Sequence, residues 1–357
     1  MKKFYVLPLL AFITIPSYGQ SQIKKYVESN AISINSIQPD FADYTDLEPI
    51  GKAIGDARIV MLGEQGHGDG AAFLAKTRLV KYLHEQKGFN VIAFEGDFFG
   101  LNAGWDEIRK EREQISKFLY DNVYTVWTRS KQCSDLLYDY IPGSYQTNIP
   151  LKVTGFDIQL YLDHSARHLK IYIDTSLRQT NIAFVKTKAY QDEFLPAVEG
   201  LTKGWLVGKE TELKVLEDHV AVILNQLGDR NNEYNWLLLK NIQSFAAANL
   251  AARNHHEATE IRDRQMAENL EWLVRKKFPN EKVIVWAANA HVSKNATTAF
   301  KFKNSRKNWM GTIFTSDSLN NASTYVLGIA SRSGVHQNVL EPTPTKVNAP
   351  QKKGLEN

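Results

Sequence analysis

The 357-residue sequence contains only one cysteine, Cys133. A single cysteine cannot form a disulfide within the chain, so we expect the hydrophobic core to stabilise the fold. Cys133 lies in a stretch of helical pattern away from any predicted strand end, and we interpret it as a partly buried thiol rather than a nucleophile. The chain also lacks a large excess of positive charge, since the formal net charge is +4 and Lys2 and Lys3 supply two of those charges. This balance argues against nucleic acid as a partner.

Long hydrophobic runs are also absent, with one exception near the start. Residues 4–15 are apolar, follow two lysines, and precede the small residues Ser17 and Gly19. The run is too short to span a bilayer, and the arrangement is typical of a cleaved signal peptide. We therefore expect residues 1–19 to be a signal peptide and the mature protein to be periplasmic or secreted. No other segment predicts a membrane span.

Three common catalytic motifs are missing. Without a Gly-x-Ser-x-Gly motif, the usual serine hydrolase route has no visible nucleophile. The glycine-rich segment after residue 62 lacks the Gly-Lys-Ser/Thr ending of a phosphate-binding P-loop. The His-Glu-x-x-His spacing of zinc proteases is also absent. Metal binding nevertheless stays open as an alternative, because Glu64, His67, Glu95 and His291 are all ligand types.

What the sequence does contain is a set of apolar, β-rich segments that each end in polar residues. The first, residues 59–62, leads into Gly63-Glu64-Gln65-Gly66-His67-Gly68. Long helical stretches separate the segments, as crossovers between parallel strands require. The carboxyl ends of parallel strands lie at one edge of a sheet, so we expect the polar side chains to line one pocket. The other three segments and their polar residues are 90–94 with Glu95, 151–156 with Asp157 and Gln159, and 282–286 with His291.

The whole pattern predicts an α/β fold with a mostly parallel central sheet flanked by helices. Between about residues 160 and 280 the chain has no convincing strand, and we interpret this part as a long helical insertion that forms a cap. A last strand is predicted at residues 324–329. We expect residues 20–340 to form a single domain and residues 341–357 to be a flexible tail, because Pro, Lys and Asn are frequent there.

His67 is the main candidate for catalysis. An imidazole can take a proton from water near neutral pH, and a carboxylate beside it can hold its tautomer and raise its basicity. Glu64, three residues earlier, and Glu95, at the next strand end, are the natural carboxylates for this role. If the protein is a hydrolase, these residues predict that water is the nucleophile.

Five short motifs together resemble the successive motifs of the erythromycin esterase-like family, over about residues 45–335. The resemblance implies that a water activated by histidine opens a macrolide lactone or a related carboxylic ester, without a serine nucleophile, a cofactor or a required metal. It also implies a small-molecule partner and a role in macrolide resistance. The five motifs are Gly63-Glu64-x-x-His67-Gly68, Phe94-Glu95, Gly155-Phe156-Asp157-x-Gln159, Arg262-Asp263-x-x-Met266-Ala267-x-Asn269 and Asn289-Ala290-His291-Val292.

The resemblance also implies roles for individual residues. By position, His67 resembles the general base, Glu64 and Glu95 its carboxylate partners, and His291 a second active-site histidine. We expect His291 or Lys76 to stabilise the charge that grows on the carbonyl oxygen. The residues assigned to substrate binding are Lys76, Asp157, Gln159 and Arg262.

Two positions depart from the family pattern. Lys76 stands where an arginine is common, which keeps the charge but loses the two-pronged geometry. Ala288 stands where a histidine is common, so one polar contact is missing. Ala288 motivates an alternative hypothesis: an exported protein that binds a small molecule, haem or a metal ion in the same pocket without turning it over.

Overall fold

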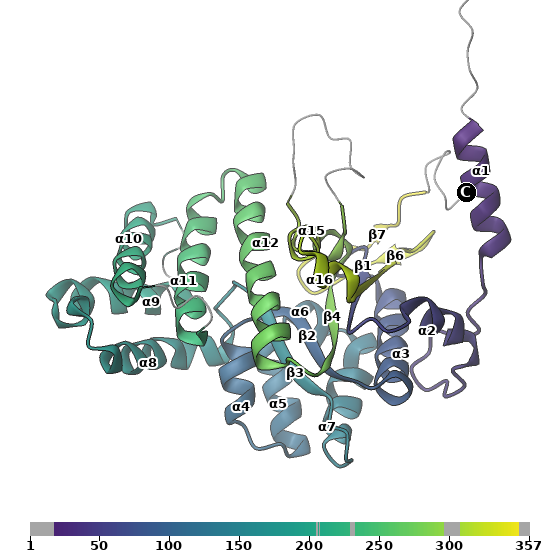
Figure 1. Cartoon of the computed structure of the whole chain (residues 1–357), viewed down its shortest axis with the longest axis horizontal. Coiled ribbons are helices and arrows are strands. Elements are labelled where there is room, and N and C mark those ends of the chain that lie inside the picture. Colours follow the sequence, from purple (N-terminus) through teal and green to yellow (C-terminus); the bar gives the residue numbers. More distant parts are fainter. Residues whose placement is uncertain (1–17, 205, 207, 229–232, 296–307, 350–357) are drawn as a thin grey trace, which may run out of the picture.

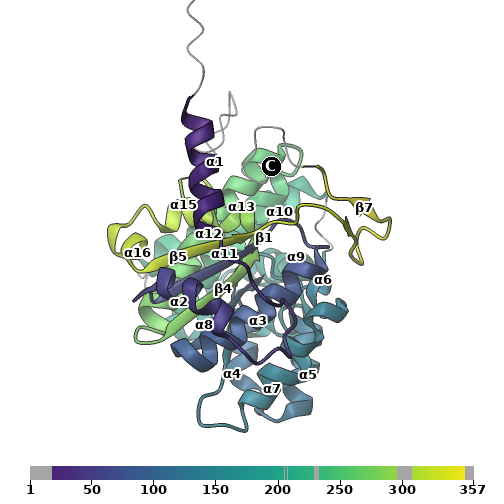
Figure 2. The same ribbon diagram turned by 90° about the vertical axis from the view of Figure 1, so that its right-hand side faces the viewer.

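The computed structural model describes residues 18–204, 206, 208–228, 233–295 and 308–349. Residues 1–17 of the predicted signal peptide lie outside this range. The first helix, α1 (Tyr18–Asn30), stands away from the body of the protein in both views (Figures 1 and 2). Among the described residues, no helix is both long and apolar enough to cross a membrane.

A five-stranded parallel sheet forms the centre of the molecule, as the sequence predicted. Its strand order is β3-β2-β4-β1-β5, and every neighbouring pair is parallel. Because all five strands are parallel, each connection between successive strands is a crossover. The strands are β1 (Ile59–Glu64), β2 (Phe89–Asp97), β3 (Lys152–Asp157), β4 (Lys282–Ala288) and β5 (Thr324–Ile329).

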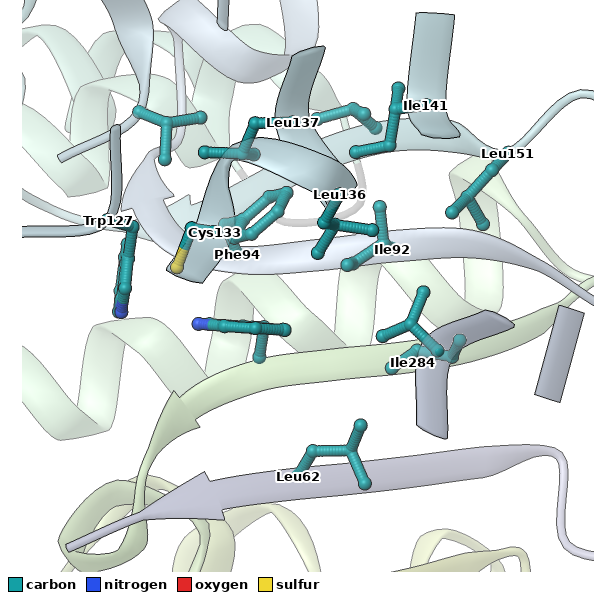
Figure 3. Packing of buried hydrophobic residues seen from close by; sticks show 14 of the residues in the cluster. Leu62, Ile92, Phe94, Trp127, Cys133, Leu136, Leu137, Ile141, Leu151 and Ile284 are labelled. Atoms are coloured by element: carbon teal, nitrogen blue, oxygen red, sulfur yellow. The ribbon is translucent and has the colours of Figure 1, made fainter. Parts of the chain in front are cut away.

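The central strands are rich in Val, Ile and aromatic residues because helices cover both faces of the sheet. On one face Leu62, Phe94 and Trp286 pack against α3 (Gly70–Lys87) and the helical segments between β2 and β3; Figure 3 shows part of this cluster. On the other face the alternate residues, such as Met61 and Val285, pack against α12 (His255–Trp272) and α15 (Met310–Phe314). Successive side chains of a strand point to opposite faces of the sheet, so the hydrophobic core consists of two layers, one on each face.

Cys133 lies in the first of these layers and is 1% exposed. Burial raises the pKa of its thiol to about 12. Such a thiol stays protonated at neutral pH, which supports the interpretation of Cys133 as an unreactive core residue.

The helix that follows β1 begins and ends for local reasons. The Asp69 Oδ1 atom accepts a hydrogen bond from the Ala72 backbone N–H at 3.1 Å and caps the start of α3. Gly88, with φ of 72°, ends the helix in the left-handed conformation that glycine adopts without strain. In the sequence, apolar residues at helical spacing cover residues 71–86, which is one residue short of this helix at each end.

The insertion between β3 and β4 is helical, as expected, and forms a lobe beside the sheet (Figure 1). The lobe has its own core, in which Ile173, Val198, Val220 and Ile242 come from four successive helices. Phe98, directly after β2, belongs to the same cluster and ties the lobe to the sheet. The helical segments of the lobe are α8 (Asp163–Thr180), η5 (Ala183–Lys186), η6 (Tyr190–Phe194), α9 (Leu195–Thr202), α10 (Glu210–Leu227) and α11 (Tyr234–Leu250).

After β5 the chain forms a small antiparallel ribbon of β6 (Val335–His336) and β7 (Thr345–Lys346) (Figure 2). The predicted tail, residues 341–357, is described as far as residue 349. The remaining helical segments are η1 (Thr45–Leu47), α2 (Glu48–Ile54), η2 (Gly100–Gly104), α4 (Trp105–Glu107), α5 (Arg112–Asn122), α6 (Thr125–Thr128), η3 (Lys131–Cys133), η4 (Asp135–Tyr140), α7 (Ile141–Ser144), η7 (Leu273–Lys277), α13 (Asn289–Val292) and α16 (Ser318–Ala322).

Candidate active site

Three neighbouring strands bring their polar ends together. Glu64, the last residue of β1, is in register with Ala288, the last residue of β4. The Ala288 backbone N–H donates a 3.0 Å hydrogen bond to Glu95 Oε2, at the end of β2. Glu64 and Glu95 therefore lie on either side of the end of β4, as the parallel arrangement predicted.

His67 lies just beyond β1 and is held by Glu64. Its Nδ1 is 3.1 Å from Glu64 Oε1, and its ring meets the ring of Trp127 edge-on at a centroid distance of 5.4 Å. The His67 side chain is 36% exposed, whereas Glu64 is fully buried. Since Glu64 engages Nδ1, Nε2 is the ring nitrogen that can serve a substrate or a water.

Glu64 is itself fixed by two groups from other elements. Lys76, on α3, forms an ion pair with Glu64 Oε2, and the Trp127 Nε1–H donates to Glu64 Oε1 at 3.3 Å. Lys76 also donates to the Ala287 carbonyl at 3.3 Å and lies 4.0 Å from the centre of the Trp286 ring. The burial of the ammonium group lowers the pKa of Lys76, against the raising effect of Glu64.

This placement changes the role expected for Lys76. The sequence suggested that Lys76 binds substrate or stabilises the developing oxyanion, but its side chain has no exposure and lies behind Glu64. Lys76 lies in the second turn of α3 and reaches Glu64 within the buried part of the protein. Lys76 is therefore placed to hold the orientation of Glu64.

The second histidine, His291, lies on the short helix α13 after β4 and is 9% exposed. Its Nδ1 is 2.8 Å from Asp263 Oδ1, and its Nε2 is 3.4 Å from Glu95 Oε1. The Met310 backbone N–H donates to the same Asp263 oxygen at 2.7 Å. When His291 is protonated, it can donate to both carboxylates; when it is neutral, Nε2 can accept from Arg262, whose Nη1 is 3.3 Å away.

Arg262, on α12, links the ends of β2 and β3. Its Nε and Nη2 atoms donate to the two carboxylate oxygens of Asp157 at 2.9 and 2.6 Å, and Nη2 also donates to Glu95 at 2.7 Å. Tyr124 donates a further 3.0 Å hydrogen bond to Asp157. This two-pronged geometry holds Asp157 and Glu95 in fixed positions.

The three titratable groups at the centre of the site perturb one another. Burial alone would raise the pKa of Glu95, but the charges of His291, Arg262 and His67 outweigh it and lower the pKa to about 2. Burial alone would lower the pKa of His67; the Glu64 hydrogen bond and the charges of Glu95 and Glu64 raise it above its ordinary value. For His291, the charges of Glu95 and Asp263 likewise outweigh burial and raise the pKa.

A cavity of about 410 Å³ lies between the helical lobe and the end of β3. Arg262 lines this cavity and also contacts His291 and Glu95, so it connects the cavity with the polar centre. Gln159 lies in the cavity wall, where its Oε1 accepts a 3.0 Å hydrogen bond from Tyr161. The wall is mainly apolar, with Ile158, Leu201, Leu206, Leu213, Phe245, Ala248, Ala252 and Ala258 among its residues.

The structure thus brings most of the predicted site residues into contact. Glu64 and His67 form one pair, and Glu95, Asp157, Arg262 and His291 form a connected network. Gln159 lies in the cavity wall, and Lys76 lies behind Glu64. In the part of the chain that the structure describes, no group of three or more His, Cys, Asp or Glu side chains could hold a metal ion.

Two functional contacts had no role assigned from the sequence. Asp263 belongs to the Arg262-Asp263 motif within a long helical stretch, and its place beside Arg262 in that motif was a usable signal. Trp127 comes from a helical turn 63 residues after Glu64, and no sequence pattern links the two.

The family model for erythromycin esterase matches residues 84–357, a range that begins after the His67 loop. The chain is 27% identical over 283 residues to the putative hydrolase YbfO of Bacillus subtilis (strain 168), an alignment that covers 73% of this chain and 62% of YbfO. It is 26% identical over 303 residues to erythromycin esterase type II of Escherichia coli, covering 76% of this chain and 69% of that protein. The chain therefore spans less than two thirds of the length of YbfO.

Solved structures share the fold. A Bacillus cereus protein superposes with a TM-score of 0.65 at 22% identity, covering 89% of this chain and 76% of that one. An erythromycin esterase mutant, EreC in its open conformation, superposes with a TM-score of 0.64 at 16% identity, covering 88% and 81%. Identities this low establish the common fold and not a common substrate. Because the family model matches more than half of the chain, the protein belongs to the erythromycin esterase family.

Proposed function

We propose that the protein is a hydrolase of carboxylic esters, including macrolide lactones, and that His67 activates the attacking water. The observation that carries this proposal is the pairing of a partly exposed His67 with the buried carboxylate of Glu64, beside a second histidine held by acids. A histidine–carboxylate pair at the carboxyl edge of a parallel sheet is suited to general base catalysis.

In the proposed reaction, His67 Nε2 takes a proton from water while the water oxygen attacks the ester carbonyl carbon. The Glu64 carboxylate stabilises the imidazolium that forms, and the ion pair with Lys76 holds Glu64 in its buried position. The tetrahedral intermediate then breaks its bond to the alcohol oxygen, which takes the proton back from His67. A lactone ring opens in this way to a single hydroxy acid.

The negative charge on the carbonyl oxygen needs donors that are positioned in advance. His291 is suited to this role because Asp263 and Glu95 favour its protonated form. Arg262 lies beside it and stays charged, since the Asp157 and Glu95 carboxylates raise its pKa further above neutrality. We propose that these two cations face the carbonyl oxygen of the substrate.

The cavity beside Arg262 is the proposed place for the apolar part of the ester. Its volume of about 410 Å³ is within the usual range for small-molecule sites, and its wall is mainly apolar. The named E. coli relatives support a macrolide as substrate and macrolide resistance as the role. Binding without turnover is not favoured, because both histidines keep their carboxylate partners and Ala288 still binds Glu95 through its backbone.

Mass spectrometry across a panel of macrolides and simple esters tests the proposal. We expect a product heavier than its substrate by one water, and we expect the His67→Ala variant, folded by circular dichroism, to form it about 10²–10⁴-fold more slowly. Parental turnover by folded His67→Ala would overturn the mechanism. Full activity after exhaustive chelation is expected; loss of activity that Zn²⁺ restores would instead identify a metal-dependent hydrolase.

We also propose that the protein is exported and acts in the periplasm or outside the cell. The proposal is supported by the two lysines, the apolar run and the small residues within residues 1–19. N-terminal sequencing of protein from the periplasmic fraction should begin at about Gln20. Full-length protein confined to the cytoplasmic fraction would contradict it.

A further inference from the structure

The segment after β5 lies along the loop that carries His67. The Ser331 backbone N–H donates to Gln65 Oε1 at 3.3 Å, and the Ser331 hydroxyl donates to Asp69 Oδ2 at 2.5 Å. The Gln337 backbone N–H donates to the Gly68 carbonyl at 3.1 Å. These three contacts bracket His67 on both sides.

The backbones of the two segments pack closely together at Gly68. A Cβ atom added there would lie 2.9 Å from both the backbone N and the backbone C of Gln337. Side chains do not fit at such a distance from another backbone, so glycine is needed at this position for packing. Gly66, on the other side of His67, has nothing within 4 Å of an added Cβ.

This segment contributes little to the hydrophobic core. Within residues 331–349 every side chain is at least partly exposed, and Val335 is 61% exposed. Hydrogen bonds within this segment hold it together: the β6–β7 pairing and a 3.0 Å hydrogen bond that the Val347 N–H donates to the Gly334 carbonyl. Core packing therefore does not account for its contacts with the His67 loop.

The contacts also reach the carboxylate partner of His67. Asp69 accepts a hydrogen bond from the Ser331 hydroxyl and also caps the start of α3. Helix α3 carries Lys76, which forms the ion pair with Glu64. The same segment thus supports the backbone next to His67 and the helix that holds Glu64.

We propose that residues 331–337, called here the strap, position His67 for the reaction, with Ser331 and Gln337 as the positioning residues. This inference rests on the proposed function of His67. A shift of about 1 Å in a catalytic group can reduce turnover by two orders of magnitude. The strap therefore acts on the rate of the chemical step rather than on the stability of the fold.

The test compares two substitutions at one position. Gln337→Pro removes the backbone N–H that donates a hydrogen bond to the Gly68 carbonyl, whereas Gln337→Ala keeps this N–H. Both substitutions remove the hydrogen bond from the Gln337 side chain to the Pro342 carbonyl. We expect kcat to fall about tenfold or more in Gln337→Pro. We expect Gln337→Ala to stay within about twofold of the parent, because the bond to Gly68 is retained. Both variants should keep the parental circular dichroism spectrum.

A second readout separates positioning from a structural role. In an NMR titration, the pKa of His67 should fall toward its ordinary value in Gln337→Pro, because the imidazole moves away from Glu64. It should be unchanged in Gln337→Ala. A folded Gln337→Pro protein with parental kcat and a parental His67 titration would overturn the proposal.

Further variants decide the matter if Gln337→Pro does not fold. Ser331→Ala should reduce kcat, and Ser331→Thr, which keeps the hydroxyl, should restore it. Gly68→Ala should reproduce the shift in the His67 titration. Parental values for folded Ser331→Ala and Gly68→Ala would also overturn the proposal. The NMR titration of His67 does not depend on hydrolysis, so it tests the role of the strap independently of the proposed function. Parental turnover by His67→Ala would instead show that the proposed function of His67 is wrong.

Discussion

The two histidines of the site occupy contrasting environments. His67 is 36% exposed, lies on a loop framed by glycines, and contacts one carboxylate. His291 is 9% exposed, lies on a short helix, and is within 3.4 Å of both Asp263 and Glu95. An exposed imidazole with one acid partner can exchange protons with water, whereas a buried imidazole between two acids is stabilised as a cation. The difference supports the proposed roles, in which His67 is the base and His291 stabilises the developing charge.

The largest expected effect tests this assignment directly. His67→Ala should reduce kcat by about 10²–10⁴-fold, the usual range for a general base. His291→Ala should reduce it by about 10²–10³-fold, the range for one oxyanion donor. Steady-state kinetics on the same ester, with folding checked by circular dichroism, measures both. An effect of His291→Ala larger than that of His67→Ala would reverse the two roles.

The acid partners should differ in their effect on stability. Glu64→Gln leaves the buried Lys76 without a counter-charge and should lower the free energy of unfolding by about 3–5 kcal/mol. Urea unfolding at neutral pH measures this change. The double variant with Lys76→Met is the control, because it removes the buried charge and should recover much of the stability without recovering activity.

On the His291 side the corresponding loss should be smaller. Asp263→Asn keeps an oxygen that can accept from Met310, and His291 can release its proton, so we expect a loss of about 1–3 kcal/mol. The NMR titration of His291 should move to lower pH at the same time, because one acid partner is lost. If Asp263→Asn lowered the free energy of unfolding as much as Glu64→Gln does, the Glu64–Lys76 and Asp263–His291 pairs would not differ in their contribution to stability.

The pH dependence of stability and of activity should also distinguish the two histidines. Both histidines have a raised pKa in the folded protein, so each contributes stability that is complete below about pH 6.5 and is lost as pH rises through the folded pKa. The proposed mechanism needs neutral His67, so the rising limb of kcat/KM should lie above about pH 6.5. The falling limb of kcat/KM at higher pH should report the deprotonation of His291. Asp263→Asn should move this falling limb to lower pH and leave the rising limb unchanged. A pH-independent kcat/KM between pH 5 and 9 would contradict a histidine base.

The smallest effect is expected away from the two histidines. Gln159→Ala removes a hydrogen-bond acceptor from the cavity wall but leaves the polar network intact. We expect KM to rise by an amount equivalent to about 0.5–1.5 kcal/mol, with kcat nearly unchanged. A large loss of kcat instead would place Gln159 in the reaction itself.

Local patterns were sufficient to predict much of the architecture and part of the site. The runs at residues 59–62, 90–94 and 282–286 form strands because Val, Ile and aromatic side chains suit a sheet buried on both faces. Parallel pairing then places Glu64, Glu95 and His291 at one edge without knowledge of the strand order. The pairing of Glu64 with His67 followed from their separation of three residues in the loop.

The residues alone thus predict the α/β class, the helical insertion, the family and the edge of the sheet where the polar residues gather, because these depend on periodicity, on turn residues and on short motifs. The three-dimensional packing was needed to show that Lys76 lies behind Glu64, that Asp263 holds His291, and that the strap reaches the His67 loop. Those contacts join residues 12, 28 and 269 positions apart. Their geometry depends on how helices and loops pack around the sheet, which no local pattern records.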